Sequence, residues 1–264
     1  MKWPQCSYLV DPQRKLLCCP VPRAASTTLK AWMLRASGVS AAEVQKRPLS
    51  LELVRAICLD RLPAREASAI LTDGSHFRFT FVRNPWTRLV SAYLGKFVPL
   101  MEPALGALHG IRRDEGVLGL LGSVRSRLGL GRPADAERGA TFRQFVRHLE
   151  RRGTTRVNGH WRAQHRFLAD HEFDFIGRFE SLQRDLAQVE ERAGVKIGWP
   201  NRHPTQYSDD EHEPGSAADW ERSQLLKLKR YPRAQAFYTP ELTDIVGRLY
   251  AEDVRRFDYA PPWA

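Results

Sequence analysis

Residues 16–30 read LLCCPVPRAASTTLK, and this stretch decides the fold. Its first part, 16–21, is apolar at nearly every position, which is the pattern of a strand buried on both faces of a sheet. From 26 to 35 the apolar residues recur with the period of a helix. A buried strand, a short loop and a helix in succession predict an α/β fold in which a parallel sheet has helices packed on it.

The loop between that strand and that helix is suited to bind phosphate or sulfate. Small residues let the backbone approach a ligand, and the start of a helix offers unpaired N–H groups at the positive end of its dipole. The residues that supply small size, hydroxyl groups or positive charge are Arg23, Ala24, Ala25, Ser26, Thr27, Thr28 and Lys30. Taken alone, the run Ser26-Thr27-Thr28 is also typical of an ordinary helix N-cap. The loop lacks the Walker A pattern, which counts against an ordinary ATPase or kinase.

A second strand–loop–helix segment, FTFVRNPWTRLVSAY at 79–93, holds another pair of candidate anion ligands. The β-like run 76–82 precedes Pro85, which suits the first position of a helix. Arg83 stands at the end of the strand, and Ser91 follows about two helical turns later. A guanidinium makes two hydrogen bonds to a phosphate and a hydroxyl makes one more, so both can bind one anion if the turn folds back.

The remaining segments complete a single domain, 1–264. Further strands are predicted at 8–10 and 173–177, further helices at 141–152, 182–193 and 240–256, and a less regular helical stretch reaches to about 65. Residues 99–140 are rich in glycine and arginine. They are interpreted as a variable insertion near the substrate entrance or as a plain surface loop.

Composition limits the partners and the cellular location. The formal net charge of +11 favours an anionic partner, whether nucleic acid, nucleotide, polyanionic glycan or membrane surface. The four cysteines show neither zinc-ligand spacing nor a dense disulfide framework, which favours a reducing compartment. Because the first residues contain no signal-peptide core and no transmembrane stretch, the chain as given is expected in the cytoplasm. A Golgi location would need a missing N-terminal anchor.

The two candidate anion sites resemble the donor-binding motifs of the sulfotransferases. Residues 21–30 are similar to the 5′-phosphosulfate-binding motif, and residues 79–93 to the 3′-phosphate-binding motif. The fuller run 81–97 is especially similar to the Golgi carbohydrate sulfotransferases, a group that includes the chondroitin and dermatan 4-O-sulfotransferases. The first also resembles the heparan sulfate 2-O-sulfotransferase. Further similarity lies at His160-Trp161, 173–180 and 249–259, so the resemblance covers nearly the whole chain and is weakest across 99–140.

This resemblance implies a sulfotransferase fold, with a P-loop-like central parallel sheet flanked by helices. It implies transfer of a sulfuryl group from 3′-phosphoadenosine 5′-phosphosulfate (PAPS) to a carbohydrate hydroxyl by in-line displacement. No bound metal is expected. The expected acceptor is an anionic glycan or glycolipid. Peripheral contact with a membrane is compatible with the charge, and nucleic acid is not expected as a partner.

The resemblance also assigns roles in donor binding. The residues carried over to the 5′-phosphosulfate are Arg23, Ala25, Ser26, Thr27, Thr28 and Lys30. The family usually has lysine where Arg23 stands. Arginine keeps the charge but does not readily donate a proton, which leaves an acid role toward the leaving group open. Arg23 and Lys30 are expected to stabilise the charge that develops on the leaving phosphate.

The second motif corresponds to the 3′-phosphate site through Arg83 and Ser91. Arg88 is a further candidate for that phosphate, or else a solvated charge on the helix. The reaction also needs a base that takes the proton of the acceptor hydroxyl.

His160 is the candidate base, since histidine titrates near neutrality and His160-Trp161 matches a family motif. A purely structural histidine is the alternative reading of this residue. His165 and Glu180 are weaker candidates for the base, and Glu180 is also a candidate for orienting the donor or a cationic residue.

Two other classes of function stay open on the sequence. A nucleic-acid-binding module would account for the charge, although the cations are not concentrated in a recognition helix or an aromatic and basic sheet motif. A catalytically silent nucleotide- or polyanion-binding protein on the same fold would account for arginine at position 23. Donor-dependent sulfate transfer separates the enzyme from both.

Overall fold

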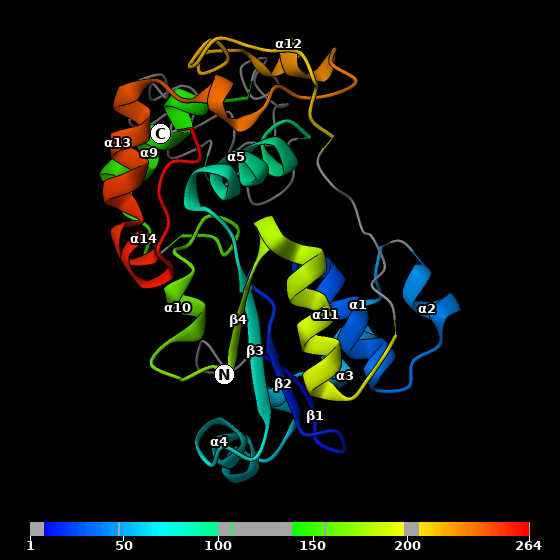
Figure 1. Ribbon diagram of the computed structural model, residues 1–264. Coiled ribbons are helices and arrows are strands. Elements are labelled where there is room, and N and C mark those ends of the chain that lie inside the picture. Colours follow the sequence, from blue (N-terminus) through cyan, green and yellow to red (C-terminus); the bar gives the residue numbers. More distant parts are fainter. Residues whose placement is uncertain are drawn as a thin grey trace, which may run out of the picture. The chain divides into compact units, whose positions relative to one another are not determined.

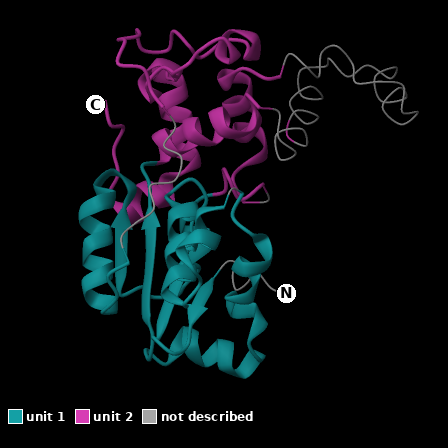
Figure 2. Ribbon diagram, turned by 90° about the vertical axis from the view of Figure 1, so that its right-hand side faces the viewer, with its two compact units in different colours: residues 1–84, 163–204 teal, residues 85–162, 205–264 magenta. Residues whose placement is uncertain are grey.

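The computed structural model describes residues 8–46, 48–99, 107, 139–155, 157–197 and 206–263. The chain divides into two compact units, and Figure 2 shows them in different colours. Unit 1 comprises residues 1–84 and 163–204, and unit 2 comprises residues 85–162 and 205–264. Neither unit is continuous in sequence. Most of the insertion predicted at 99–140 lies outside the described residues.

Unit 1 is built on a four-stranded sheet with the order β1-β2-β3-β4 (Figure 1). Its strands are β1 (Leu9–Asp11), β2 (Leu16–Cys19), β3 (Phe77–Val82) and β4 (Phe175–Arg178). The strands β2, β3 and β4 run parallel, and β1 pairs antiparallel with β2 as a hairpin. The α/β class and the four strand positions predicted from the sequence are confirmed.

The apolar run that forms β2 is buried on both faces of the sheet. Cys18 belongs to the core that includes Trp32 of the following helix, whereas Cys19 points the other way and its thiol lies 3.6 Å from the carbonyl of Phe167. Burial raises the pKa of both thiols well above its ordinary value. Both cysteines therefore act as small apolar residues with unreactive thiols.

Helices cover this sheet from both sides (Figure 1). The regular helices α1 (Ser26–Ala36) and α11 (Leu182–Ala193) match the predicted ranges closely. Both contribute side chains to the main core of the unit, where the ring of Trp32 packs edge-on against Phe79 at 5.7 Å between centroids. The other helical segments of unit 1 are α2 (Ala41–Gln45), α3 (Leu51–Ala56), the 3₁₀ turn η2 (Leu59–Arg61), α4 (Ala64–Thr72), α10 (His165–Leu168) and the 3₁₀ turn η3 (Phe179–Ser181).

Unit 2 is helical in the part that the structure describes. Its elements are α5 (Pro85–Lys96), α9 (Phe142–Arg152), α12 (Arg222–Leu226), the 3₁₀ turn η4 (Ala234–Phe237), α13 (Pro240–Leu249) and α14 (Ala251–Phe257). Thr141 and Gln144 form a capping box at the start of α9, which confirms that predicted helix. An aromatic cluster around Tyr93, Phe97, Phe142 and Phe145 forms the core.

The single helix predicted at 240–256 is wrong. Two helices occupy this range, and they meet at Tyr250, where φ is −114° and ψ is 25°. The phenol of Tyr250 is buried and donates to the carbonyl of Trp161 at 2.6 Å. A hydrogen bond to a distant segment thus accompanies the break, which an apolar stripe in the sequence does not reveal. None of the helices among the described residues combines the length and apolarity that crossing a bilayer requires.

Candidate functional site

The loop after β2 has an unusual backbone for its residue types. Arg23 and Ala25 both adopt left-handed conformations, with φ of 68° and 58°. Such a conformation costs a residue with a side chain roughly 1–2 kcal/mol, and strain of this kind is concentrated at functional sites. Ala25 is the N-cap of α1 and no side chain caps this end. The interpretation of Ser-Thr-Thr as an N-cap is therefore wrong, because Ser26 is already the first helical residue.

The start of α1 presents its backbone N–H groups without a side-chain cap. The first hydrogen bond of the helix runs from the N–H of Leu29 to the carbonyl of Ala25, 3.0 Å away. The three preceding N–H groups, of Ser26, Thr27 and Thr28, have no partner within the helix. Thr27 is exposed, Ser26 is half-buried and Thr28 is buried. This end of the helix can accept the oxygens of an anion.

Arg83 joins the first loop to the second motif within unit 1. It follows β3, whose Thr80 is opposite Cys19 of β2, so the carboxyl ends of the two strands lie side by side. The buried guanidinium of Arg83 donates to the carbonyl of Arg23 at 3.4 Å and lies 4.2 Å from the ring centroid of Phe179. The parallel sheet thus brings together two candidate ligands that are 60 residues apart in sequence.

Two side chains hold the backbone just after β3. Gln164 is fully buried and pairs with both peptide groups of Arg83: it accepts from the N–H at 2.9 Å and donates to the carbonyl at 2.7 Å. Glu180 accepts from the N–H of Asn84 at 2.8 Å. Sequence reasoning missed Gln164, since no pattern around it indicates a partner 81 residues away. For Glu180 the sequence offered two roles, a base or a group that orients the donor or a cationic residue, and the observed contact lies beside Arg83.

Lys30 lies on α1, beyond the loop, and faces a different environment from Arg23 and Ala25. It is half-buried on the first turns of α1. Burial lowers the pKa of its amine below the ordinary value, and the nearby thiols of Cys58 and Cys18 act in the opposite direction. Its described electrostatic neighbours therefore belong to the core of unit 1.

The other candidates belong to unit 2. Ser91 is buried on α5, and Arg88 is almost fully buried one turn earlier. The guanidinium of Arg88 donates to the carbonyl of Arg162 at 2.8 Å and to that of Gly159 at 3.3 Å. The interpretation of Arg88 as a solvated charge is therefore wrong, because this cation ties α5 to the segment that carries His160.

His160 is half-buried in that segment, outside any helix or strand. The side-chain oxygen of Asn158 accepts from its backbone N–H at 3.0 Å and lies 2.7 Å from its ring nitrogen Nδ1. The neighbouring Trp161 is buried against Phe97 and Phe145. The alternative base, His165, belongs to unit 1 at the start of α10.

With this geometry established, comparison with known proteins identifies the family. The model of the sulfotransferase family matches residues 7–260, which is nearly the whole chain. The chain belongs to the sulfotransferase family. The family and the fold class predicted from the sequence are thereby confirmed.

Several curated relatives of this sulfotransferase family carry the name carbohydrate sulfotransferase. The chain is 29% identical to carbohydrate sulfotransferase 14 of Danio rerio over 201 residues, and 31% identical to the Homo sapiens protein of the same name over 200 residues. Each alignment covers 74% of this chain and 50% or 49% of the relative. Carbohydrate sulfotransferase 8 of Homo sapiens is 25% identical over 266 residues, which cover 97% of this chain and 56% of the relative. The chain thus spans about half the length of these relatives. No solved structure shows a significant match.

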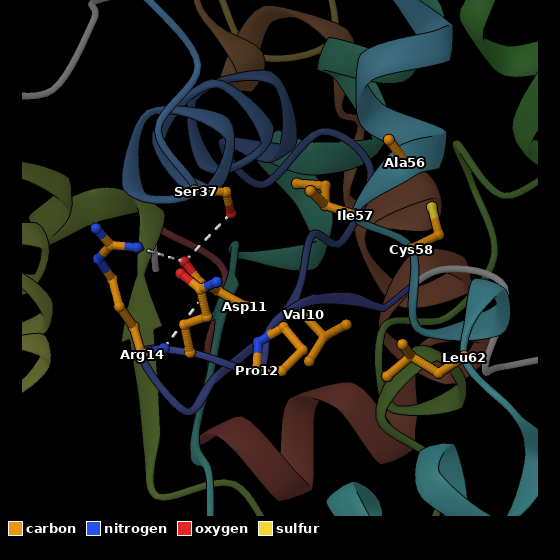
Figure 3. A pocket seen from close by; sticks show the side chains of 10 residues that line it. Val10, Asp11, Pro12, Arg14, Ser37, Ala56, Ile57, Cys58 and Leu62 are labelled. Carbon is orange, nitrogen blue, oxygen red and sulfur yellow. Dashed lines mark hydrogen bonds and ion pairs between the residues drawn. The ribbon is translucent and has the colours of Figure 1, made fainter.

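A separate hollow of about 380 Å³ lies at the turn of the β1–β2 hairpin (Figure 3). Asp11 lines it, and its carboxylate accepts from the backbone N–H and guanidinium of Arg14 and from the hydroxyl of Ser37. Asp11 pairs with Leu16, the first residue of β2, so this hollow is at the opposite edge of the sheet from the loop of Arg23. Its carboxylate is engaged by neighbouring groups, and none of the candidate donor-binding residues lines the hollow.

The described residues contain no group of three or more His, Cys, Asp or Glu side chains able to hold a metal ion. What unit 1 does offer is positive charge and backbone N–H groups beyond the carboxyl ends of its parallel strands. This is where ligands bind in open α/β sheets.

Proposed function

We propose that the protein moves a sulfuryl group from PAPS to a hydroxyl of a carbohydrate. The observation that carries this proposal is the edge of unit 1 where the strained loop of Arg23 and Ala25 meets Arg83. Family membership and the names of the curated relatives support the reaction type and the carbohydrate acceptor.

The donor is PAPS in this proposal because unit 1 offers two kinds of anion ligand at one edge. The N–H groups at the start of α1 and the hydroxyls of Ser26, Thr27 and Thr28 suit the 5′-phosphosulfate, together with the backbone of Ala25. Arg83 suits the 3′-phosphate, because a guanidinium binds phosphate through two parallel hydrogen bonds. The assignment of Ser91 to the same phosphate rests on the family resemblance.

In the transfer itself, the acceptor oxygen forms a bond to sulfur as the bond from sulfur to the phosphate oxygen of the donor breaks. His160 takes the proton of the acceptor hydroxyl. Arg23 stabilises the charge that develops on the leaving phosphate, because a preformed positive group there costs no reorganisation during the reaction. Lys30 is the second candidate for this stabilisation.

An anionic glycan or glycolipid is the proposed acceptor class. The net charge of +11 provides a long-range attraction for such a chain. The competing proposal is a protein that binds the nucleotide without transferring sulfate, and arginine instead of lysine at position 23 is the feature that favours it.

Thermal unfolding with nucleotides tests the donor site. A ligand that binds only the folded state stabilises it by about 2.7 kcal/mol at a hundred times its Kd. We expect 3′-phosphoadenosine 5′-phosphate to raise the Tm, and adenosine 5′-phosphate to raise it less. Equal stabilisation by the two nucleotides would contradict the assignment of Arg83 to the 3′-phosphate.

Transfer of labelled sulfate from PAPS to a panel of glycans tests the activity. Product on a uronate-bearing or sulfated glycan is the expected result. Nucleotide binding without product on any glycan would favour the silent binding protein. Salt-sensitive binding of DNA without nucleotide binding would favour a nucleic-acid module.

A further inference from the structure

The contacts of Asn158 determine which nitrogen of His160 carries the proton. The oxygen Oδ1 accepts from the backbone N–H of His160 at 3.0 Å, and since an N–H group can only donate, this atom is the oxygen of the amide. The same oxygen lies 2.7 Å from Nδ1 of the ring. An amide oxygen carries no hydrogen, so Nδ1 must be the donor. The neutral ring therefore has its proton on Nδ1 and its lone pair on Nε2.

That tautomer is the one that a base acting through Nε2 requires. A ring protonated on Nε2 has no lone pair at that nitrogen and cannot accept a proton there. In enzymes that use histidine as a base, a third group commonly orients the ring and sets its tautomer in this way. Asn158 is placed to be that third group for His160.

The backbone on both sides of His160 is held by hydrogen bonds from distant side chains. The contact between Asn158 and the His160 ring therefore forms within a fixed segment. Arg88 donates to the carbonyls of Gly159 and Arg162, on either side of His160. Tyr250 donates to the carbonyl of Trp161 at 2.6 Å. Three carbonyl groups within four residues are thus held by buried side chains from α5 and from the junction of α13 and α14.

Asn158 itself is exposed, in contrast to these anchors. Its carbonyl accepts from the N–H groups of Trp161 and Arg162, both at 3.1 Å, and its side-chain oxygen adds the bond from the N–H of His160. Replacing the side chain by alanine removes the acceptor of Nδ1 and one bond of the turn, whereas both backbone bonds and the three anchored carbonyls remain.

We propose that Asn158 is a positioning residue that holds His160 in the tautomer with a base-competent Nε2. This inference rests on the proposed function, which assigns the base role to His160. Asn158 touches neither donor nor acceptor in this proposal, and acts through His160.

Three variants of the full chain test it. Asn158→Ala removes the acceptor, Asn158→Asp keeps an oxygen in the same place, and Gln235→Ala is a control that removes another exposed amide of unit 2. We expect Asn158→Ala to lower kcat by about 10- to 100-fold, the cost of a misplaced reacting group, with KM for donor and acceptor nearly unchanged. Asn158→Asp should recover most of the loss, and Gln235→Ala should behave as wild type. A merely structural role would lower the Tm of Asn158→Ala and leave both kcat of the folded protein and the protonation of the His160 ring unchanged. Rescue by aspartate alone does not separate the two roles, because its carboxylate also accepts from the backbone N–H of His160.

The ring protonation is measured separately by ¹⁵N NMR of histidine-labelled protein, with the His160 signals assigned by their absence in His160→Gln. The neutral ring should be protonated on Nδ1 in the wild type and in Asn158→Asp, and should lose that preference in Asn158→Ala. If the wild type shows no sulfate transfer, the proposed function fails, and the NMR measurement still decides whether Asn158 sets the tautomer. A wild-type ring protonated on Nε2, or wild-type kcat in Asn158→Ala, would overturn the inference.

Discussion

The loop of Arg23 and Ala25 contains two left-handed residues and receives one contact from a distant side chain, that of Arg83, whereas the segment of His160 is held by side chains from two helical regions of unit 2. In the first, two left-handed residues and an uncapped helix start create a surface of N–H groups. In the second, Arg88 and Tyr250 reach in from separate helical regions to hold carbonyl groups. The N–H groups that an anion can bind come from one short stretch of sequence, although Arg83 reaches this loop from 60 residues away. A site that must orient a single imidazole depends on distant residues.

The largest effect is expected from His160→Ala. Loss of a general base lowers turnover by about 10²- to 10⁴-fold, while donor affinity stays near the wild-type value. His212→Ala is the matched control, because His212 is also half-buried in unit 2 and its ring nitrogen bonds a backbone carbonyl at 3.1 Å. Turnover measured with labelled PAPS and nucleotide Kd measured by calorimetry check the result. Near-normal turnover in a folded His160→Ala protein would contradict the base assignment and leave His165 and Glu180 as the candidates.

Arg83→Ala should have the next largest effect, on donor affinity. Loss of a charge-assisted, partly desolvated contact weakens nucleotide binding by roughly 2–4 kcal/mol. Loss of the contacts to Phe179 and to the carbonyl of Arg23 adds a smaller cost in fold stability, about 1 kcal/mol. The matched control is Arg78→Ala, at the opposite end of β3, where the guanidinium pairs with Asp174 at 3.3 Å. Donor binding at wild-type strength in Arg83→Ala would contradict the 3′-phosphate assignment.

Arg88→Met separates the anchoring role from a phosphate contact. The substitution leaves the carbonyls of Gly159 and Arg162 without this donor, and we expect a loss of about 1–3 kcal/mol in the free energy of unfolding. Turnover should fall because His160 is displaced, while nucleotide affinity stays close to normal. Urea unfolding and nucleotide titration check both parts. A loss of affinity as large as in Arg83→Ala would show that Arg88 binds the donor.

The smallest effect is expected from Ala25→Gly. Glycine relieves the strain at φ of 58° but makes the unfolded chain more flexible, so the free energy of unfolding should change by less than about 1 kcal/mol. Donor affinity should not change, because the loop binds through backbone N–H groups. Ala31→Gly, in the right-handed interior of α1, is the control and should lose at least about 1 kcal/mol. A large loss of affinity in Ala25→Gly would show that the methyl group of Ala25 itself contributes to binding.

Much of the fold could be predicted because its signals are local. The apolar run at 16–21, the alternation at 76–82 and Pro85 locate two parallel strands and the start of a helix from neighbouring residues alone. The family could be predicted in the same way, from ordered motifs. The pairing of Asn158 with His160 also had a sequence signal, since asparagine commonly bonds the backbone two residues onward, and this signal was overlooked.

The sequence by itself thus determined the α/β class, the strand–loop–helix segments, the family and the residues from which a donor site can be built. Only the tertiary structure decided that Ala25 caps α1, that Arg88 is a buried anchor and that Gln164 and Glu180 hold the backbone beside Arg83. It also decided that 240–256 is two helices. The physical reason is the separation in sequence over which each signal acts. Backbone preference and apolar periodicity depend on residues that are close neighbours in the chain. The partner of a buried guanidinium or amide is whichever carbonyl or N–H group the packed chain brings within hydrogen-bond distance, and leaving a buried polar group unpaired is costly.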